Sequence, residues 1–181
     1  MSADVNQVAN QLIALGLEHS HPLTPLEVQK LLYFVDGWHL ALTKTPLIDE
    51  EFQAWARGPV IPSIYDRLKA YSGCAIPRSE IRSTTICSLS ELALDLIRRV
   101  YETYKEHDPG SLVGLTHLPN SPWDQTRAEH GLRKNEASDV VIKKSLMERW
   151  FSEVWKVALE PANSEIIWAE PDDYADWLAV A

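Results

Sequence analysis

The chain has 181 residues, the length of one domain, and its 45% hydrophobic and 24% charged residues are typical of a folded globular protein rather than a disordered or fibrous one. Its formal net charge of −9 repels a phosphate backbone, which argues against nonspecific nucleic-acid binding. The N-terminus has no basic region followed by an apolar run, and no stretch approaches the ~18 apolar residues of a membrane span, so we expect a cytoplasmic protein without a membrane segment.

Two helices are predicted at the N-terminal end of the chain. Apolar residues at helical spacing predict the first helix over residues 3–16. The second is predicted over residues 24–42, where Thr24 and Glu27 have the spacing of a capping box. Pro25 fits the first helical position, because its missing N–H has no partner there in any case. This second helix therefore has a well-defined start.

Gly37 is an unusual residue for the interior of the second helix. Glycine costs about 1 kcal/mol relative to alanine at such a position. We therefore expect a backbone segment or an aromatic ring to pack closely against position 37.

The rest of the chain is predicted to be mainly helical, with a small β element. Residues 52–55 alternate like a short strand before the sequence RGPVIPS interrupts them, and residues 83–87 offer another short β segment. Further helices are predicted over residues 62–73, 88–106, 111–117 and 140–155, with one more capped start at Ser121-Pro122-Trp123. The fold class is therefore mainly α: a single compact helical domain over residues 1–156 and an acidic, aromatic C-terminal tail over residues 157–181.

The tail carries two-thirds of the net charge. It contains six acidic and no basic residues, whereas the preceding 156 residues contain 20 acidic and 17 basic ones. Trp168, Tyr174 and Trp177 interleave with these acids, a composition suited to laying aromatic anchors into grooves of a basic partner. The same side chains could instead fold back onto the protein's own domain, and the sequence leaves both alternatives open.

No catalytic, metal or cofactor site stands out in the sequence. No two histidines have the spacing of a zinc-hydrolase helix, and there is no nucleophile elbow, phosphate loop or dinucleotide fingerprint. A hydrolase would have to use His39 or His117, and the sequence places no nucleophile beside His39. Cys74 and Cys87 are expected to be free thiols. We therefore expect a protein that is not an enzyme and needs no metal or cofactor.

Three stretches of the sequence resemble the Panacea domain family, which includes the SocA-like antitoxins and many phage-associated proteins. They are LTPLEVQKLLYFVDGWHLAL, PLIDEEFQAWARGPVIPSIYDRLKAY and LTHLPNSPW, and the resemblance covers about residues 5–155. It implies an antitoxin that neutralises a cognate protein toxin, encoded nearby, by direct binding. One branch of the family is similar to proteolytic adaptors, which would add a Clp-type protease as a partner.

The residues of this signature divide into an expected core and an expected partner-binding surface. The apolar and aromatic members are expected in the core: Leu31, Leu32, Phe34, Trp38, Trp55, Pro59 and Tyr65. The polar and amphipathic members are expected at an exposed groove beside it: Gln29, Lys30, Tyr33, His39 and Arg57. Arg57 precedes Gly58-Pro59, a stiff turn that would reduce the entropy lost on binding. Together with Trp168, Tyr174 and Trp177 of the tail, these residues are the candidate partner contacts.

A phage- or operon-associated transcriptional regulator is the alternative function. Residues 3–16 and 24–42 are two predicted helices with a short link, as in a helix-turn-helix. The second helix offers few basic or amide side chains for a DNA groove, so we expect no nucleic-acid partner. The sequence does not determine the toxin's identity or the oligomeric state.

Overall fold

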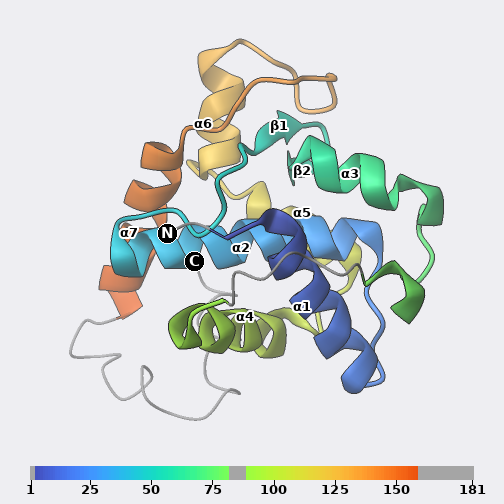
Figure 1. Cartoon of the computed structure of the whole chain (residues 1–181). Coiled ribbons are helices and arrows are strands. Elements are labelled where there is room, and N and C mark those ends of the chain that lie inside the picture. Colours follow the sequence, from blue (N-terminus) through green and yellow to red (C-terminus); the bar gives the residue numbers. More distant parts are fainter. Residues whose placement is uncertain (1–2, 82–88, 159–181) are drawn as a thin grey trace.

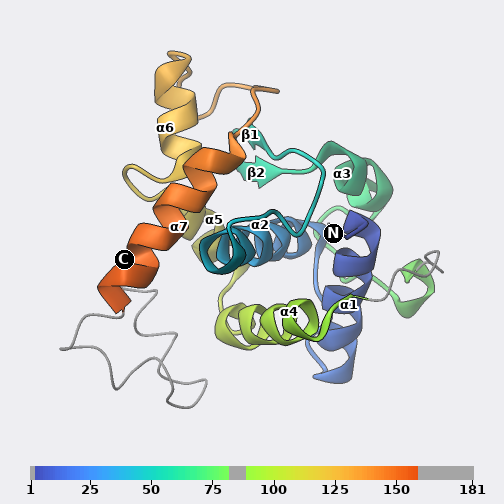
Figure 2. The same cartoon turned by 60° about the vertical axis from the view of Figure 1, so that its left-hand side comes forward.

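Helix α2 (Pro25–Thr43) lies at the centre of the fold in the computed structural model, which describes residues 3–81 and 89–158 (Figure 1). The elements that contact it are α1 (Val5–Glu18), β2 (Gly58–Val60), α3 (Pro62–Leu68), α4 (Glu91–Tyr104), α5 (Pro109–Thr116) and α7 (Lys144–Ala158). In Figure 2, α2 is seen nearly end-on, with α4 below it, α1 and α7 on either side and the hairpin above. The prediction of a mainly α fold with a small β element is confirmed.

The remaining elements are short. Strand β1 (Gln53–Trp55) pairs with β2 in an antiparallel hairpin in which Ala54 is opposite Pro59. Two 3₁₀ turns, η1 (Lys69–Tyr71) and η2 (Arg78–Glu80), follow α3, and α6 (Pro122–Glu129) packs on β1 and α7. No helix in the described ranges is long and apolar enough to cross a membrane.

The predicted start of α2 is confirmed in atomic detail. The backbone N–H of Thr24 donates to Glu27 Oε2 over 2.7 Å, and the Thr24 hydroxyl oxygen accepts from the Glu27 N–H over 3.4 Å, which completes the capping box. The helix differs from an ordinary amphipathic one because every residue from Glu27 to Ala41 is buried. Such a helix is surrounded by protein on all sides.

Several predicted helix boundaries are wrong: α3 ends at Leu68 rather than at residue 73, and α4 begins at Glu91 rather than at residue 88. For α1 and α7 the contacts explain the difference. Helix α1 continues through Gly16 to Glu18; a Cβ at Gly16 would lie 2.8 Å from the carbonyl oxygen of His21, so this glycine permits close packing rather than ending the helix. Helix α7 begins at Lys144, because residues 140–142 are extended and hydrogen-bonded to the strand segment, with Ile142 N donating to Phe52 O over 2.7 Å.

The sequence RGPVIPS, predicted to interrupt the strand, contributes β2 instead, since Gly58 and Pro59 pair with β1 across a two-residue turn. The β segment predicted over residues 83–87, with Cys87 in it, lies outside the described residues.

The expected close packing at Gly37 is confirmed. The ring of Phe151, from α7, occupies the space beside it, and a Cβ at position 37 would lie 2.2 Å from Phe151 Cε2. The same ring contacts Trp38 edge-on, with ring centroids 5.1 Å apart. Gly37 thus permits a close contact between α7 and the central helix, and the packing of an aromatic ring offsets the helical cost of glycine.

Candidate functional site

The β1–β2 hairpin is held in place by polar side chains of α2. The Gln29 amide forms two hydrogen bonds with the backbone of Ile61, donating to its carbonyl over 3.0 Å and accepting from its N–H over 2.9 Å. On the next residue, Lys30 Nζ donates to the carbonyl oxygen of Pro59 over 2.9 Å. These bonds satisfy backbone groups that the short second strand leaves unpaired.

Lys30 is fully buried, and within the described ranges no carboxylate pairs with it. Burial lowers its pKa from 10.5 to about 7. Its ammonium group lies against Gly58, where a Cβ would be 2.8 Å from Lys30 Nζ and 2.6 Å from Thr116 Oγ1. Gly58 also has a φ of +94°, so both its backbone and its surroundings require glycine.

The LTHLPNSPW segment supports the hairpin from the other side. Trp123 Nε1 donates to the carbonyl oxygen of Trp55 over 2.7 Å, and His117 stacks on the Trp123 ring with centroids 3.6 Å apart. Burial, followed by the positive charge of Lys30, lowers the pKa of His117 to about 4. The imidazole is therefore neutral at physiological pH, and its role here is packing. The three stretches of the signature meet around this hairpin.

Four of the five domain residues predicted to lie in an exposed groove are buried, so that part of the prediction is wrong. Gln29 and Lys30 hold the hairpin, and Tyr33 lies among core rings, with its centroid 5.5 Å from that of Phe52. His39 lies near the C-terminal end of α2, where its Nδ1 is 2.8 Å from the carbonyl oxygen of Thr45. The physical reason is that neighbouring elements bury α2 from Glu27 to Ala41, so that of these four residues only Gln29 also lines the open groove described next.

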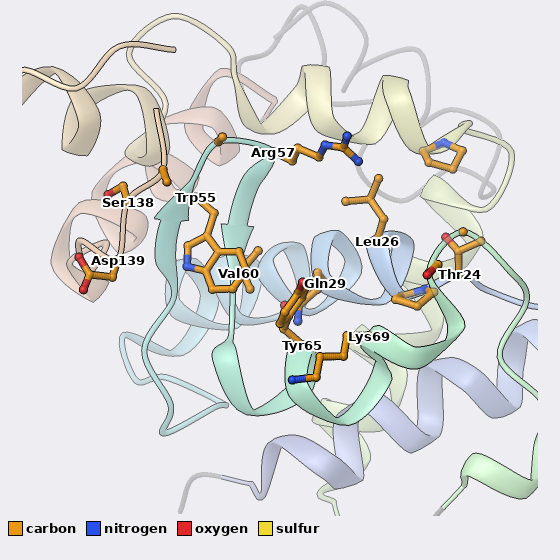
Figure 3. A pocket seen from close by; sticks show the side chains of 16 residues that line it. Thr24, Leu26, Gln29, Trp55, Arg57, Val60, Tyr65, Lys69, Ser138 and Asp139 are labelled. Atoms are coloured by element: carbon orange, nitrogen blue, oxygen red, sulfur yellow. The ribbon is translucent and has the colours of Figure 1, made fainter. Parts of the chain in front are cut away.

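An open groove of about 960 Å³ lies beside the hairpin (Figure 3). It is bounded by the hairpin, the first turn of α2 and α3 with η1. We call it the hairpin groove and define it by six lining residues: Leu26, Trp55, Arg57, Val60, Tyr65 and Lys69. Arg57 extends from the hairpin turn and Lys69 from the end of α3, on opposite sides of Leu26 and Gln29 (Figure 3).

The prediction that Tyr65 lies in the core is also wrong, since its side chain is 42% exposed. Its ring packs edge-on against Trp55, itself only half-buried, with centroids 4.8 Å apart. Helix α3 buries Ile64 and Leu68, four residues apart, so the neighbouring Tyr65 points away from the core. That i, i+4 spacing was the signal in the sequence that could have placed Tyr65 in the groove.

Arg57 is exposed at the rim of the groove, as expected, and its partner-binding role stays a prediction. Trp168, Tyr174 and Trp177 lie outside the described residues. Within residues 3–81 and 89–158, no three His, Cys, Asp or Glu side chains come together as metal ligands would.

Comparisons with known proteins identify a family whose matched region covers the residues around the hairpin. The family model described as "Antitoxin SocA-like, Panacea domain" matches residues 28–124, which include all but the first three residues of α2, the whole hairpin and the LTHLPNSPW segment. The antitoxin SocA of Caulobacter vibrioides is 30% identical over 131 residues, or 68% of this chain and 70% of that protein. No solved structure matches the chain. On the family match and this relative together, the chain belongs to the SocA-like antitoxin family, with a Panacea domain.

Proposed function

We propose that this SocA-like antitoxin neutralises a protein toxin by direct, non-catalytic contact through the hairpin groove, acting in the cytoplasm where the toxin is made. The observation that carries the proposal is the exposed, largely apolar groove with Tyr65 and Arg57 at its surface. Tyrosine and arginine supply much of the binding energy at protein interfaces. The rigid support of the hairpin by Gln29 and Lys30 lowers the entropy that binding would cost.

The buried state of α2 bears on the transcriptional alternative. A helix-turn-helix protein presents its second helix to the major groove. Gln29 and Lys30, the residues of α2 suited to reading bases, instead bond the hairpin backbone. A regulator built on this fold would therefore need another surface for DNA.

The proposal is tested by co-expressing the protein with the product of the adjacent open reading frame, scoring growth rescue and co-purification. We expect rescue and a stable complex with the wild type. Arg57→Glu and Tyr65→Ala should each weaken co-purification by about tenfold or more, since interface anchors contribute about 2 kcal/mol when truncated.

Two exposed residues of α4 supply matched controls, Arg98→Glu for the charge and Leu92→Ala for the apolar side chain. Both should leave the complex intact. Loss of binding in the controls as well, or full binding by both groove variants, would contradict the assignment of the surface.

The same strains separate two modes of neutralisation. A toxin level that stays constant during rescue indicates inhibition by binding. A toxin level that falls, and recovers when a Clp-type protease is deleted, indicates proteolytic delivery.

A further inference from the structure

The hairpin groove combines an apolar floor with one arginine, Arg57, at its rim. Lys69 forms a solvent-exposed ion pair with Asp66 over 2.7 Å, whereas Arg57 has no ion pair among the described residues. Asp139 is the one acidic residue that lines the groove within the described ranges. The surface therefore suits an extended segment that alternates aromatic and acidic side chains.

The C-terminal end of this chain has that chemistry. Residues 170–181, EPDDYADWLAVA, contain four acidic residues and no basic one, with Tyr174 between two of the acids and Trp177 directly after Asp176. Two aromatic anchors flanked by acids could place their rings on the apolar floor and their carboxylates toward Arg57.

Chain length determines which part of the tail can reach the groove. Helix α7 meets the far end of α2, where Lys44 Nζ donates to Ser152 Oγ, and the groove lies at the opposite end, beside Thr24 and Leu26. The length of α2 is roughly 28 Å, and the six residues from Ser152 to Ala158 add roughly 9 Å. At about 3.3 Å per extended residue, the chain needs roughly a dozen residues after Ala158 to cover that span. Residues from about 170 onward can therefore reach the groove even if this full span must be covered.

We propose that residues 170–181 dock in the hairpin groove of their own chain. Tyr174 and Trp177 are the anchors, and the flanking carboxylates pair with Arg57. This deepens the proposed function, because the tail then occupies the surface on which that function places the toxin. The toxin and the tail compete for the groove, and the tail covers its apolar floor when no toxin is bound.

The test is cross-linking in the full chain with a short bismaleimide. Cys74 is exposed and follows Gly73, which lines the groove, so it provides one thiol at the site. The second is introduced as Ala175→Cys, between the proposed anchors, in a Cys87→Ser background. The matched control is Asn163→Cys, which lies five residues after Ala158 and is too close to α7 to reach the groove.

We expect intramolecular cross-linking of the Ala175→Cys chain to exceed that of the Asn163→Cys chain several-fold in dilute protein. Adding Arg57→Glu, or neutralising Asp172, Asp173 and Asp176 to asparagine, should reduce it to the control level. Equal yields from both cysteines, or a yield that these changes leave unaltered, would overturn docking. Cross-linked dimers in place of the intramolecular product would show docking on a second copy and overturn it in cis.

This experiment contains no toxin, so it fails or succeeds independently of the co-purification assay. A negative cross-link leaves the proposed function standing. Full toxin binding by Arg57→Glu, in turn, leaves the docked tail standing.

Discussion

Gly37 and Lys30 are two residues that an ordinary helix interior would exclude, and both are explained by what packs against them. Glycine at position 37 makes room for the Phe151 ring, and the buried ammonium group of Lys30 bonds the backbone of the hairpin. Each residue is unfavourable in the helix interior, and a contact with a residue distant in sequence compensates for that cost. At the scale of the residue, two substitutions test this account.

Gly37→Ala should destabilise the protein by up to about 2 kcal/mol. The added methyl overlaps the Phe151 ring, which costs about 1–3 kcal/mol, while the gain in helix propensity returns about 1 kcal/mol. Urea unfolding measures the difference. The control is Gly114→Ala in α5, where no atom lies within 4 Å of the added Cβ, so its stability should be unchanged or higher by up to about 1 kcal/mol. Equal stabilities of both variants would refute the role assigned to Phe151.

The buried Lys30 should make stability depend on pH. Between its lowered pKa of about 7 and its unfolded value of 10.5, the unfolded chain holds a proton that the folded chain has released. Stability therefore rises with pH across this window, with a slope approaching about 1.4 kcal/mol per unit. Lys30→Met should lose that slope in urea titrations from pH about 7 to about 9, below the range in which most tyrosines ionise. Identical slopes for the two proteins would show that Lys30 keeps its proton when folded.

At the scale of the elements, Asp36 joins three parts of the fold. Its Oδ1 accepts from the N–H groups of Leu47 and Ile48, over 2.8 and 3.0 Å, and Lys144 Nζ donates to its Oδ2 over 2.5 Å. One buried carboxylate thus connects the central helix, the loop that follows it and the first turn of α7. Its three hydrogen bonds compensate for its removal from water.

Asp36→Asn should cost roughly 2–4 kcal/mol, because it removes the charge that pairs with Lys144 and replaces an acceptor oxygen with a donor group. The matched control is Asp95→Asn, whose carboxylate pairs with Arg99 on the exposed face of α4 and should contribute within about 0.5 kcal/mol. Thermal and denaturant unfolding measure both. Similar small losses for the two variants would mean that Asp36 does not join these elements.

At the scale of the whole molecule, α2 is the element whose opening would expose the core, since α1, α3, α4, α5, α7 and β2 all contact it. Its amides should therefore exchange with deuterium only through global unfolding, while α3 and η1, at the rim of the groove, exchange through smaller openings. Hydrogen exchange followed by mass spectrometry over increasing urea tests this order. Faster exchange in α2 than in α4 or α7 would contradict a central role for α2.

Features that depend on neighbouring residues can be predicted from the amino-acid sequence alone. The start of α2 follows from Thr24, Pro25 and Glu27, whose hydrogen bonds close within one helical turn, and the close contact at Gly37 followed from the cost of glycine in a helix. The mainly α class and the resemblance to the SocA-like antitoxins likewise depended on local pattern and motif.

Which of these residues are buried depends on contacts between segments that are far apart in the chain. Gln29, Lys30 and Tyr33 have side chains that suit a surface, and they are buried because the hairpin and α7, distant in sequence, close over α2. Strand β2 exists because Gly58 and Pro59 find a partner in β1, and Tyr65 is exposed because its neighbours Ile64 and Leu68 face the core. Burial is a property of what packs against a residue, and that partner comes from another part of the chain.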